Sequence, residues 1–251
     1  MRSAAGFSNG ETMKKTITEF RDINELSSAA AGYVYAAAKA EVKRKGYFTL
    51  ALSGGKTIIP FYKKLVREKM PWKKTYIFWQ DDRFVKYSHK DSNVRLVFDN
   101  LISPAKIPFD NIYPAPAHDN FAPAHKAAWV YELIIRQVFK HLRPGKAMPS
   151  FDLIIGGMGD DGHTASLFPG DVKALNEKTK LITSVKAPKY AAIRERITMT
   201  LKLMNKAKNI LMLTEEKGRE AVLERVLKGD KRYPAARLNP KERLTWMIAK
   251  T

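Results

Sequence analysis

The sequence of 251 residues contains no cysteine. This absence excludes disulfide bonds, thiolate nucleophiles and cysteine-ligated metal sites, and it suits a reducing compartment such as the cytoplasm, where we expect the protein. No apolar run is long enough for a membrane-spanning helix, so no membrane contact is expected. Residues 1–12 lack the apolar core of a secretory signal and are rich in small residues, so we expect a disordered extension there.

Acidic residues are scarce relative to basic ones. The chain has 45 lysines and arginines against 25 acidic residues, which gives a formal net charge of +20. Such an excess attracts anions, including phosphorylated metabolites, nucleic acids and acidic surfaces. The basic residues are spread along the chain without a nucleic-acid-binding motif. We therefore favour a solvated basic surface and do not expect a nucleic-acid partner.

Segments with strand and helix patterns alternate along the chain. A helix is expected at residues 23–45, because Asp22 can cap its start and Gly46 can end it. The alternation predicts an α/β fold with an open, mostly parallel twisted sheet and helices on both faces. With no repeat or linker, residues 13–251 are expected to form one domain. The expected strands are 47–52, 76–79, 151–155, 181–185, 197–201 and 209–214, with further helices at 58–69, 92–101 and 216–228 and one beginning at Pro123.

Three polar segments follow expected strands, namely residues 53–57, 81–83 and 160–163. Parallel strands end at one edge of a sheet, and ligands of open α/β sheets bind there. We therefore expect these segments to converge on one site.

The first segment, Ser-Gly-Gly-Lys-Thr, can hold a phosphate. Its candidate contacts are the backbone N–H groups of Gly54 and Gly55 and the side chains of Lys56 and Thr57, at the start of a helix. The spacing fits neither a Walker A loop nor a dinucleotide fingerprint, and a tight strand-to-helix turn is an equal alternative.

The second segment, Asp81-Asp82-Arg83, carries two carboxylates and a guanidinium. Neighbouring residues of an extended chain face opposite ways, so Asp81 and Arg83 are expected to share one side and Asp82 the other. Arg83 can hold a phosphate bidentately, and a surface ion pair is the alternative.

The third segment contains Asp160, Asp161 and His163 within a glycine-rich loop. A histidine there can act as a general base near neutral pH or can hold the loop structurally. No second histidine lies at metal-ligand spacing, so neither a metal nor another cofactor is expected. The chain also lacks Gly-x-Ser-x-Gly, which favours activated water over a covalent intermediate. The backbone N–H groups near Gly159 are candidate donors to an oxyanion or a phosphate.

These segments together resemble the 6-phosphogluconolactonase family over nearly the whole chain after Met13. The most specific match is the stretch Gly-Met-Gly-Asp-Asp-Gly-His-Thr-Ala-Ser-Leu-Phe-Pro at 157–169. The other matching motifs are at 52–57, 81–83, 92–93, 196–198, 234–238 and 244–246.

The resemblance implies hydrolysis of 6-phospho-D-glucono-1,5-lactone, the second step of the oxidative pentose phosphate pathway. His163 would activate water, and Asp81 would orient His163 or the water. Arg83 and Arg196 would bind the phosphate. Arg194 is an alternative to Arg196, because the segment that leads into the Arg-Ile-Thr motif is longer and more charged here than is usual in the family. The protein would act as a monomer or a homodimer.

Two other functions are compatible with these residues. Glucosamine-6-phosphate deaminases share the fold, and such an enzyme would use Asp81 to abstract a carbon-bound proton. A phosphosugar sensor or a nucleic-acid-associated protein would bind without turnover. The run His-Thr-Ala-Ser-Leu-Phe at 163–168 favours the lactonase over the deaminase.

Overall fold

The computed structural model describes residues 13–146 and 148–251, so the disorder expected for residues 1–12 lies outside the described residues. Within that part, seven strands form one sheet in which every paired strand is parallel. Their order is β1 (Lys14–Phe20), β10 (Arg243–Ala249), β9 (Asn209–Glu215), β6 (Leu153–Gly157), β2 (Phe48–Leu52), β3 (Thr75–Trp79) and β5 (Ile112–Tyr113).

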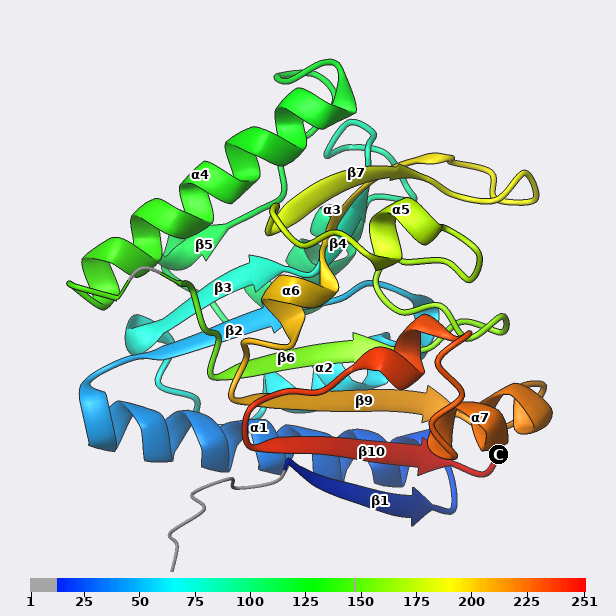
Figure 1. Cartoon of the computed structure of the whole chain (residues 1–251). Helices are drawn as coiled ribbons and strands as arrows, with labels where there is room; N and C mark the ends of the chain where they lie inside the picture. The colour runs from blue at the N-terminus through cyan, green and yellow to red at the C-terminus, as the bar shows by residue number, and fades with distance from the viewer. Residues whose placement is uncertain (1–12, 147) are drawn as a thin grey trace, which may run out of the picture.

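Helices lie on both sides of this sheet, as the alternating pattern predicts. Helices α1 (Ile23–Lys45) and α2 (Ile59–Leu65) lie behind the sheet in Figure 1, whereas α6 (Leu201–Met204) lies in front of it. The α/β fold with a mostly parallel sheet is therefore confirmed. The remaining helices are α3 (Asn93–Val97), α4 (Ala124–Leu142), α5 (Val172–Leu175) and α7 (Glu220–Leu227).

The ends of α1 show how local sequence sets an element. The Asp22 side chain accepts hydrogen bonds from the backbone N–H groups of Asn24 and Glu25, which satisfies two donors of the first turn. Gly46 ends the helix with a φ of +87°, a conformation that favours glycine. The bounds predicted from these two residues match the helix observed.

A second, antiparallel sheet of three strands departs from the prediction. Its order is β4 (Asp81–Arg83), β8 (Glu195–Met199) and β7 (Ile182–Lys186). The chain leaves the parallel sheet after Trp79, and β4 then pairs with β8 in the second sheet. The sequence analysis also did not predict β1, β5 and β10.

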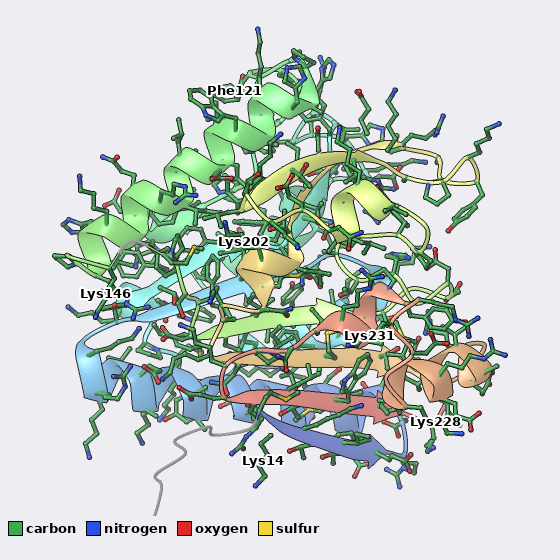
Figure 2. The ribbon with its side chains drawn as sticks, in the orientation of Figure 1. Lys14, Phe121, Lys146, Lys202, Lys228 and Lys231 are labelled. Atoms are coloured by element: carbon green, nitrogen blue, oxygen red, sulfur yellow. The ribbon has the colours of Figure 1, made fainter. Side chains whose placement is uncertain are left out.

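Basic side chains are distributed over the molecule rather than gathered in one region. The lysines labelled in Figure 2, Lys14, Lys146, Lys202, Lys228 and Lys231, come from distant parts of the fold. This distribution agrees with a solvated basic surface. Within the described residues, we find no helix with both the length and the apolar character needed to span a membrane.

Asp152, directly before β6, links that strand to α1 and β2. Its buried carboxylate accepts hydrogen bonds from Lys45 Nζ (2.7 and 2.8 Å), the Thr49 N–H (2.8 Å) and Thr49 Oγ1 (2.9 Å). We expect Asp152→Ala to lower the free energy of unfolding by about 1–3 kcal/mol, because the buried N–H group of Thr49 and the half-buried ammonium of Lys45 lose their partner. Urea denaturation measures this change. Glu224→Ala removes the exposed partner of Lys228 and serves as the control. Equal, small effects of both substitutions would contradict the role given to Asp152.

Candidate active site

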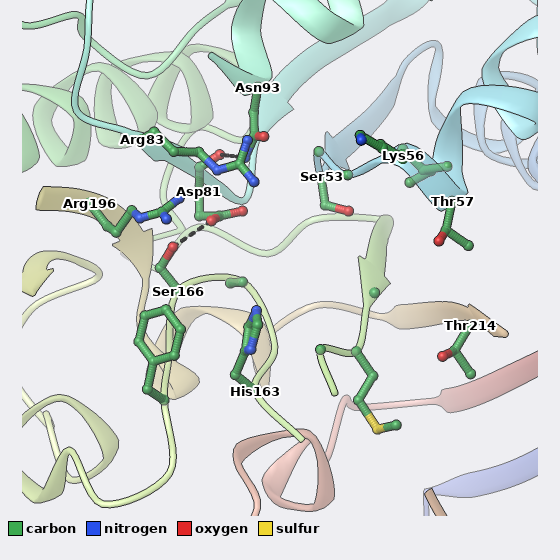
Figure 3. Close-up of a pocket in the computed structure, with 18 of the residues that line it drawn as sticks. Ser53, Lys56, Thr57, Asp81, Arg83, Asn93, His163, Ser166, Arg196 and Thr214 are labelled. Carbon is green, nitrogen blue, oxygen red and sulfur yellow. Dashed lines mark hydrogen bonds between the residues drawn. The ribbon is translucent and has the colours of Figure 1, made fainter. Parts of the chain in front are cut away.

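A pocket of about 430 Å³ lies at the carboxyl ends of the parallel strands (Figure 3). Residues from all three predicted polar segments line it, so their expected convergence is observed. The chain brings them together because β2 and β6 are neighbours in the sheet, while β4 crosses beside their ends. Further lining residues are Ile58, Asn93, Gly157, Met158, Gly159, Ala165, Ser166, Phe168, Tyr190, Ala191, Arg196, Leu213, Thr214 and Arg219.

His163 stands on the loop that follows β6, and its partner is Asp161. The distance from His163 Nδ1 to Asp161 Oδ1 is 2.5 Å, and the same oxygen accepts the backbone N–H of His163 at 3.0 Å. An ionised carboxylate only accepts hydrogen bonds, so Nδ1 carries the proton and Nε2 is left as the basic nitrogen. Of the two roles expected for Asp81, orienting His163 is contradicted, because the carboxylate bound to the imidazole is that of Asp161. The other expected role, orienting the water, remains a prediction.

The electrostatics of Asp161 fit this pairing. Burial alone would raise the pKa of Asp161. The hydrogen bonds and positive charge that His163 supplies, together with the Tyr190 hydroxyl, outweigh burial and hold this pKa well below its usual range. Asp161 is thus a carboxylate at neutral pH, and it can stabilise an imidazolium at His163.

Gly159 does not have the donor role expected for its backbone N–H group. Its N–H donates to the carbonyl of His163 at 3.0 Å, so this donor is engaged within the loop and is not free for an oxyanion or a phosphate. A Cβ atom at Gly159 would lie 2.1 Å from His163 Cε1. The imidazole ring of His163 therefore occupies space that a side chain at position 159 would fill.

Asp81 is buried and lines the same pocket. Its Oδ2 accepts a hydrogen bond from Ser166 Oγ at 2.6 Å, and its carbonyl accepts one from Asn93 Nδ2 at 3.1 Å (Figure 3). Asp82 points away, as predicted, and accepts the backbone N–H of Asn93 at 2.6 Å. Ser166 and Asn93 belong to motifs quoted above, but the sequence did not single them out as site residues.

Two arginines face the pocket side by side. Arg83 on β4 and Arg196 on β8 are register partners, and neither forms an ion pair with the described residues. Arg83 Nη1 donates to the Asp91 carbonyl at 2.8 Å, whereas the buried Arg196 Nε has no partner in that part of the chain. Burial and then the neighbouring Arg83 lower the pKa of Arg196. Two close cations of this kind favour an anion between them.

Arg194, the alternative to Arg196, lies outside the pocket. Its Nε donates to the carbonyl of Ala187 at 3.2 Å, in the connection between β7 and β8. Of the two arginines, the structure therefore brings Arg196 to the site.

The Gly-Gly-Lys-Thr loop lines the opposite side of the pocket from Arg196 in Figure 3. Gly55 has a φ of +109°, and a Cβ atom on Gly54 would lie 1.8 Å from Asn93 Oδ1. Both glycines are thus required by the shape of the turn. Lys56 begins a short 3-10 turn before α2, and Thr57 Oγ1 donates to Glu215 Oε2 at 3.3 Å.

Two further lining residues that make polar contacts, Arg219 and Tyr190, were also not predicted. Arg219 precedes α7 and donates from Nε to Asp160 Oδ1 at 2.7 Å, and Tyr190 donates its hydroxyl to Asp161 Oδ2 at 2.7 Å. Neither stands in a recognisable motif. The one available signal for Tyr190 was the unusual segment before Arg196. Among residues 13–146 and 148–251, no group of three or more His, Asp or Glu side chains is arranged to hold a metal ion.

Comparisons with known proteins agree with this geometry. Residues 21–246 match the family model described as glucosamine-6-phosphate isomerases/6-phosphogluconolactonase. The 6-phosphogluconolactonase of Nostoc sp. is 34% identical over 94% of this chain and 96% of its own, and that of Synechocystis sp. is 35% identical over 82% and 84%. The crystal structure of the Thermotoga maritima 6-phosphogluconolactonase superposes with a TM-score of 0.82 at 30% identity, over 94% of this chain and all of that chain. The chain therefore belongs to the 6-phosphogluconolactonase family, within the wider group that includes the glucosamine-6-phosphate isomerases.

Proposed function

We propose that this protein hydrolyses 6-phospho-D-glucono-1,5-lactone to 6-phospho-D-gluconate in the oxidative pentose phosphate pathway. The observation that carries the proposal is one pocket holding both a carboxylate-bound histidine and a pair of arginines that form no ion pair with residues 13–146 or 148–251. The first can activate water and the second can hold a phosphate. The names of the relatives support the same reaction.

In the proposed reaction, His163 Nε2 takes a proton from water as the water oxygen attacks the lactone carbonyl. Asp161 stabilises the imidazolium that forms. The bond between the carbonyl carbon and the ring oxygen then breaks, and His163 returns its proton to that oxygen. No covalent enzyme intermediate and no cofactor takes part. Asp81, held by Ser166, is proposed to orient the water.

Arg83 and Arg196 are proposed to bind the phosphate, and Lys56, Thr57 and the backbone of Gly54 and Gly55 are proposed to contact the substrate from the other side of the pocket. Holding the phosphate away from the carbonyl fixes the lactone for attack by water. The large positive charge of the chain favours capture of a dianion at low salt. We further propose that the protein acts in the cytoplasm as a monomer or a homodimer.

The deciding experiment is proton release from freshly prepared lactone near neutral pH, compared with its spontaneous hydrolysis. Acceleration by the protein supports the proposal. No acceleration, with ammonia released from glucosamine 6-phosphate, would instead identify a deaminase. Binding without turnover would indicate a sensor, and a steep salt dependence of DNA or RNA binding would indicate a nucleic-acid partner.

Gly159 offers a test of how the imidazole is placed. Gly159→Ala puts a methyl group where His163 Cε1 lies, so we expect kcat to fall by about 100-fold as the ring is displaced by roughly 1 Å. The control is Gly32→Ala in α1, outside the pocket, whose added methyl group would have no atom within 4 Å. Steady-state kinetics of both variants measure the effect. Similar kcat values in the two variants would show that the His163 ring can shift without loss of activity, which would contradict this prediction.

A further inference from the structure

The connection between β7 and β8 reaches to the carboxylate that holds His163. Its base is closed by two hydrogen bonds, from the Ala187 N–H to the Arg194 carbonyl at 2.7 Å and from Arg194 Nε to the Ala187 carbonyl at 3.2 Å. The Ala191 N–H donates to the Pro188 carbonyl at 3.0 Å and tightens the turn. Residues 187–194 therefore form a closed loop, and Tyr190 and Ala191 in this 187–194 loop line the pocket.

Tyr190 meets the site through its hydroxyl group. Tyr190 is 74% exposed, so burial of apolar surface does not explain the position of its side chain. The hydroxyl donates to Asp161 Oδ2 at 2.7 Å, which leaves Oδ1 to His163. This hydrogen bond raises the pKa of Tyr190 to about 12, so the hydroxyl keeps its proton and remains a donor at neutral pH.

The two oxygens of Asp161 are thus anchored on two different segments. A carboxylate anchored at one oxygen can rotate about its Cβ–Cγ bond, and the second anchor restricts that rotation. We propose that Tyr190 is a positioning residue, which fixes Asp161 so that His163 keeps its proton on Nδ1 and presents Nε2 to the pocket. The catalytic consequence rests on the proposed function, whereas the structural consequence is measurable without substrate.

The first test is Tyr190→Phe in the substrate-free protein. The variant keeps the exposed ring and loses the hydroxyl, so its backbone amide spectrum should match that of the wild type. The observable is the downfield NMR signal of the His163 Nδ1 proton, which we expect to shift or to broaden through faster exchange with water. The control is Tyr233→Phe, because the Tyr233 ring packs beside Gly162 and its hydroxyl has no hydrogen bond to the described residues.

The second test is steady-state kinetics on the lactone. We expect Tyr190→Phe to lower kcat about three- to tenfold while KM changes less than about twofold. The reason is that the lost hydroxyl group positions the general base and does not bind the substrate. An unchanged Nδ1 signal, or a kcat equal to that of Tyr233→Phe, would overturn the positioning role. If the wild type itself fails to hydrolyse the lactone, the proposed function fails and the NMR comparison alone decides whether Tyr190 fixes Asp161.

Discussion

His163→Ala should lower kcat for lactone hydrolysis by about 10²–10⁴-fold, the usual contribution of a positioned general base. KM should change little, because the imidazole acts on water and the phosphate is held elsewhere in the pocket. The loss follows from the geometry of the site, in which Asp161 occupies Nδ1 and leaves Nε2 as the basic atom. Proton release under saturating lactone measures kcat, with spontaneous hydrolysis subtracted.

The matched control for this substitution is His125→Ala, which removes an exposed histidine at the start of α4. Its kcat should equal that of the wild type. If His163→Ala kept wild-type turnover while folding normally, the base would have to be another group, and Asp81 in the same pocket would be the next candidate.

Arg83→Ala should raise KM for the lactone by about 10–100-fold. A hydrogen bond from a guanidinium to a charged oxygen contributes about 1.5–3 kcal/mol, and each 1.4 kcal/mol corresponds to a factor of ten in binding. The effect on kcat should be smaller, because Arg196 still holds the phosphate. Substrate titrations of initial rates separate the two constants.

Arg67→Ala is the control for charge alone, since Arg67 is an exposed arginine outside the pocket. It lowers the net charge by the same amount and should leave KM near the wild-type value at moderate salt. Equal rises in KM for both variants would mean that the arginines act by long-range attraction, and the assignment of Arg83 to the phosphate would be wrong.

The features predicted correctly from sequence depend on local chemistry or on general rules of topology. Asp22 and Gly46 define α1 because caps involve residues next to one another. The polar segments converge because the carboxyl ends of parallel strands share one edge. The opposite directions of Asp81 and Asp82 follow from the geometry of an extended chain.

The features that were missed depend on distant partners. β1 is mostly exposed at the edge of the sheet, so its sequence has little of the apolar pattern that marks a strand. Nothing near Asp81 indicates that its strand pairs with β8, more than a hundred positions later. The choice between Asp81 and Asp161 as the partner of His163 is likewise a matter of side-chain geometry. Arg219 and Tyr190 reach the pocket from connections whose course the sequence does not specify.

The pairing of β1 with β10 has a consequence for how the chain folds on the ribosome. Because synthesis proceeds from the N-terminus, residues 14–20 are made more than two hundred positions before their neighbour in the sheet, residues 243–249. A nascent chain stopped before residue 243 can assemble β9, β6, β2 and β3, but β9 is then an unpaired edge and β1 has no place in the sheet. β1 is therefore among the last strands of the sheet to be incorporated, and translation must pass residue 249 before the sheet is complete.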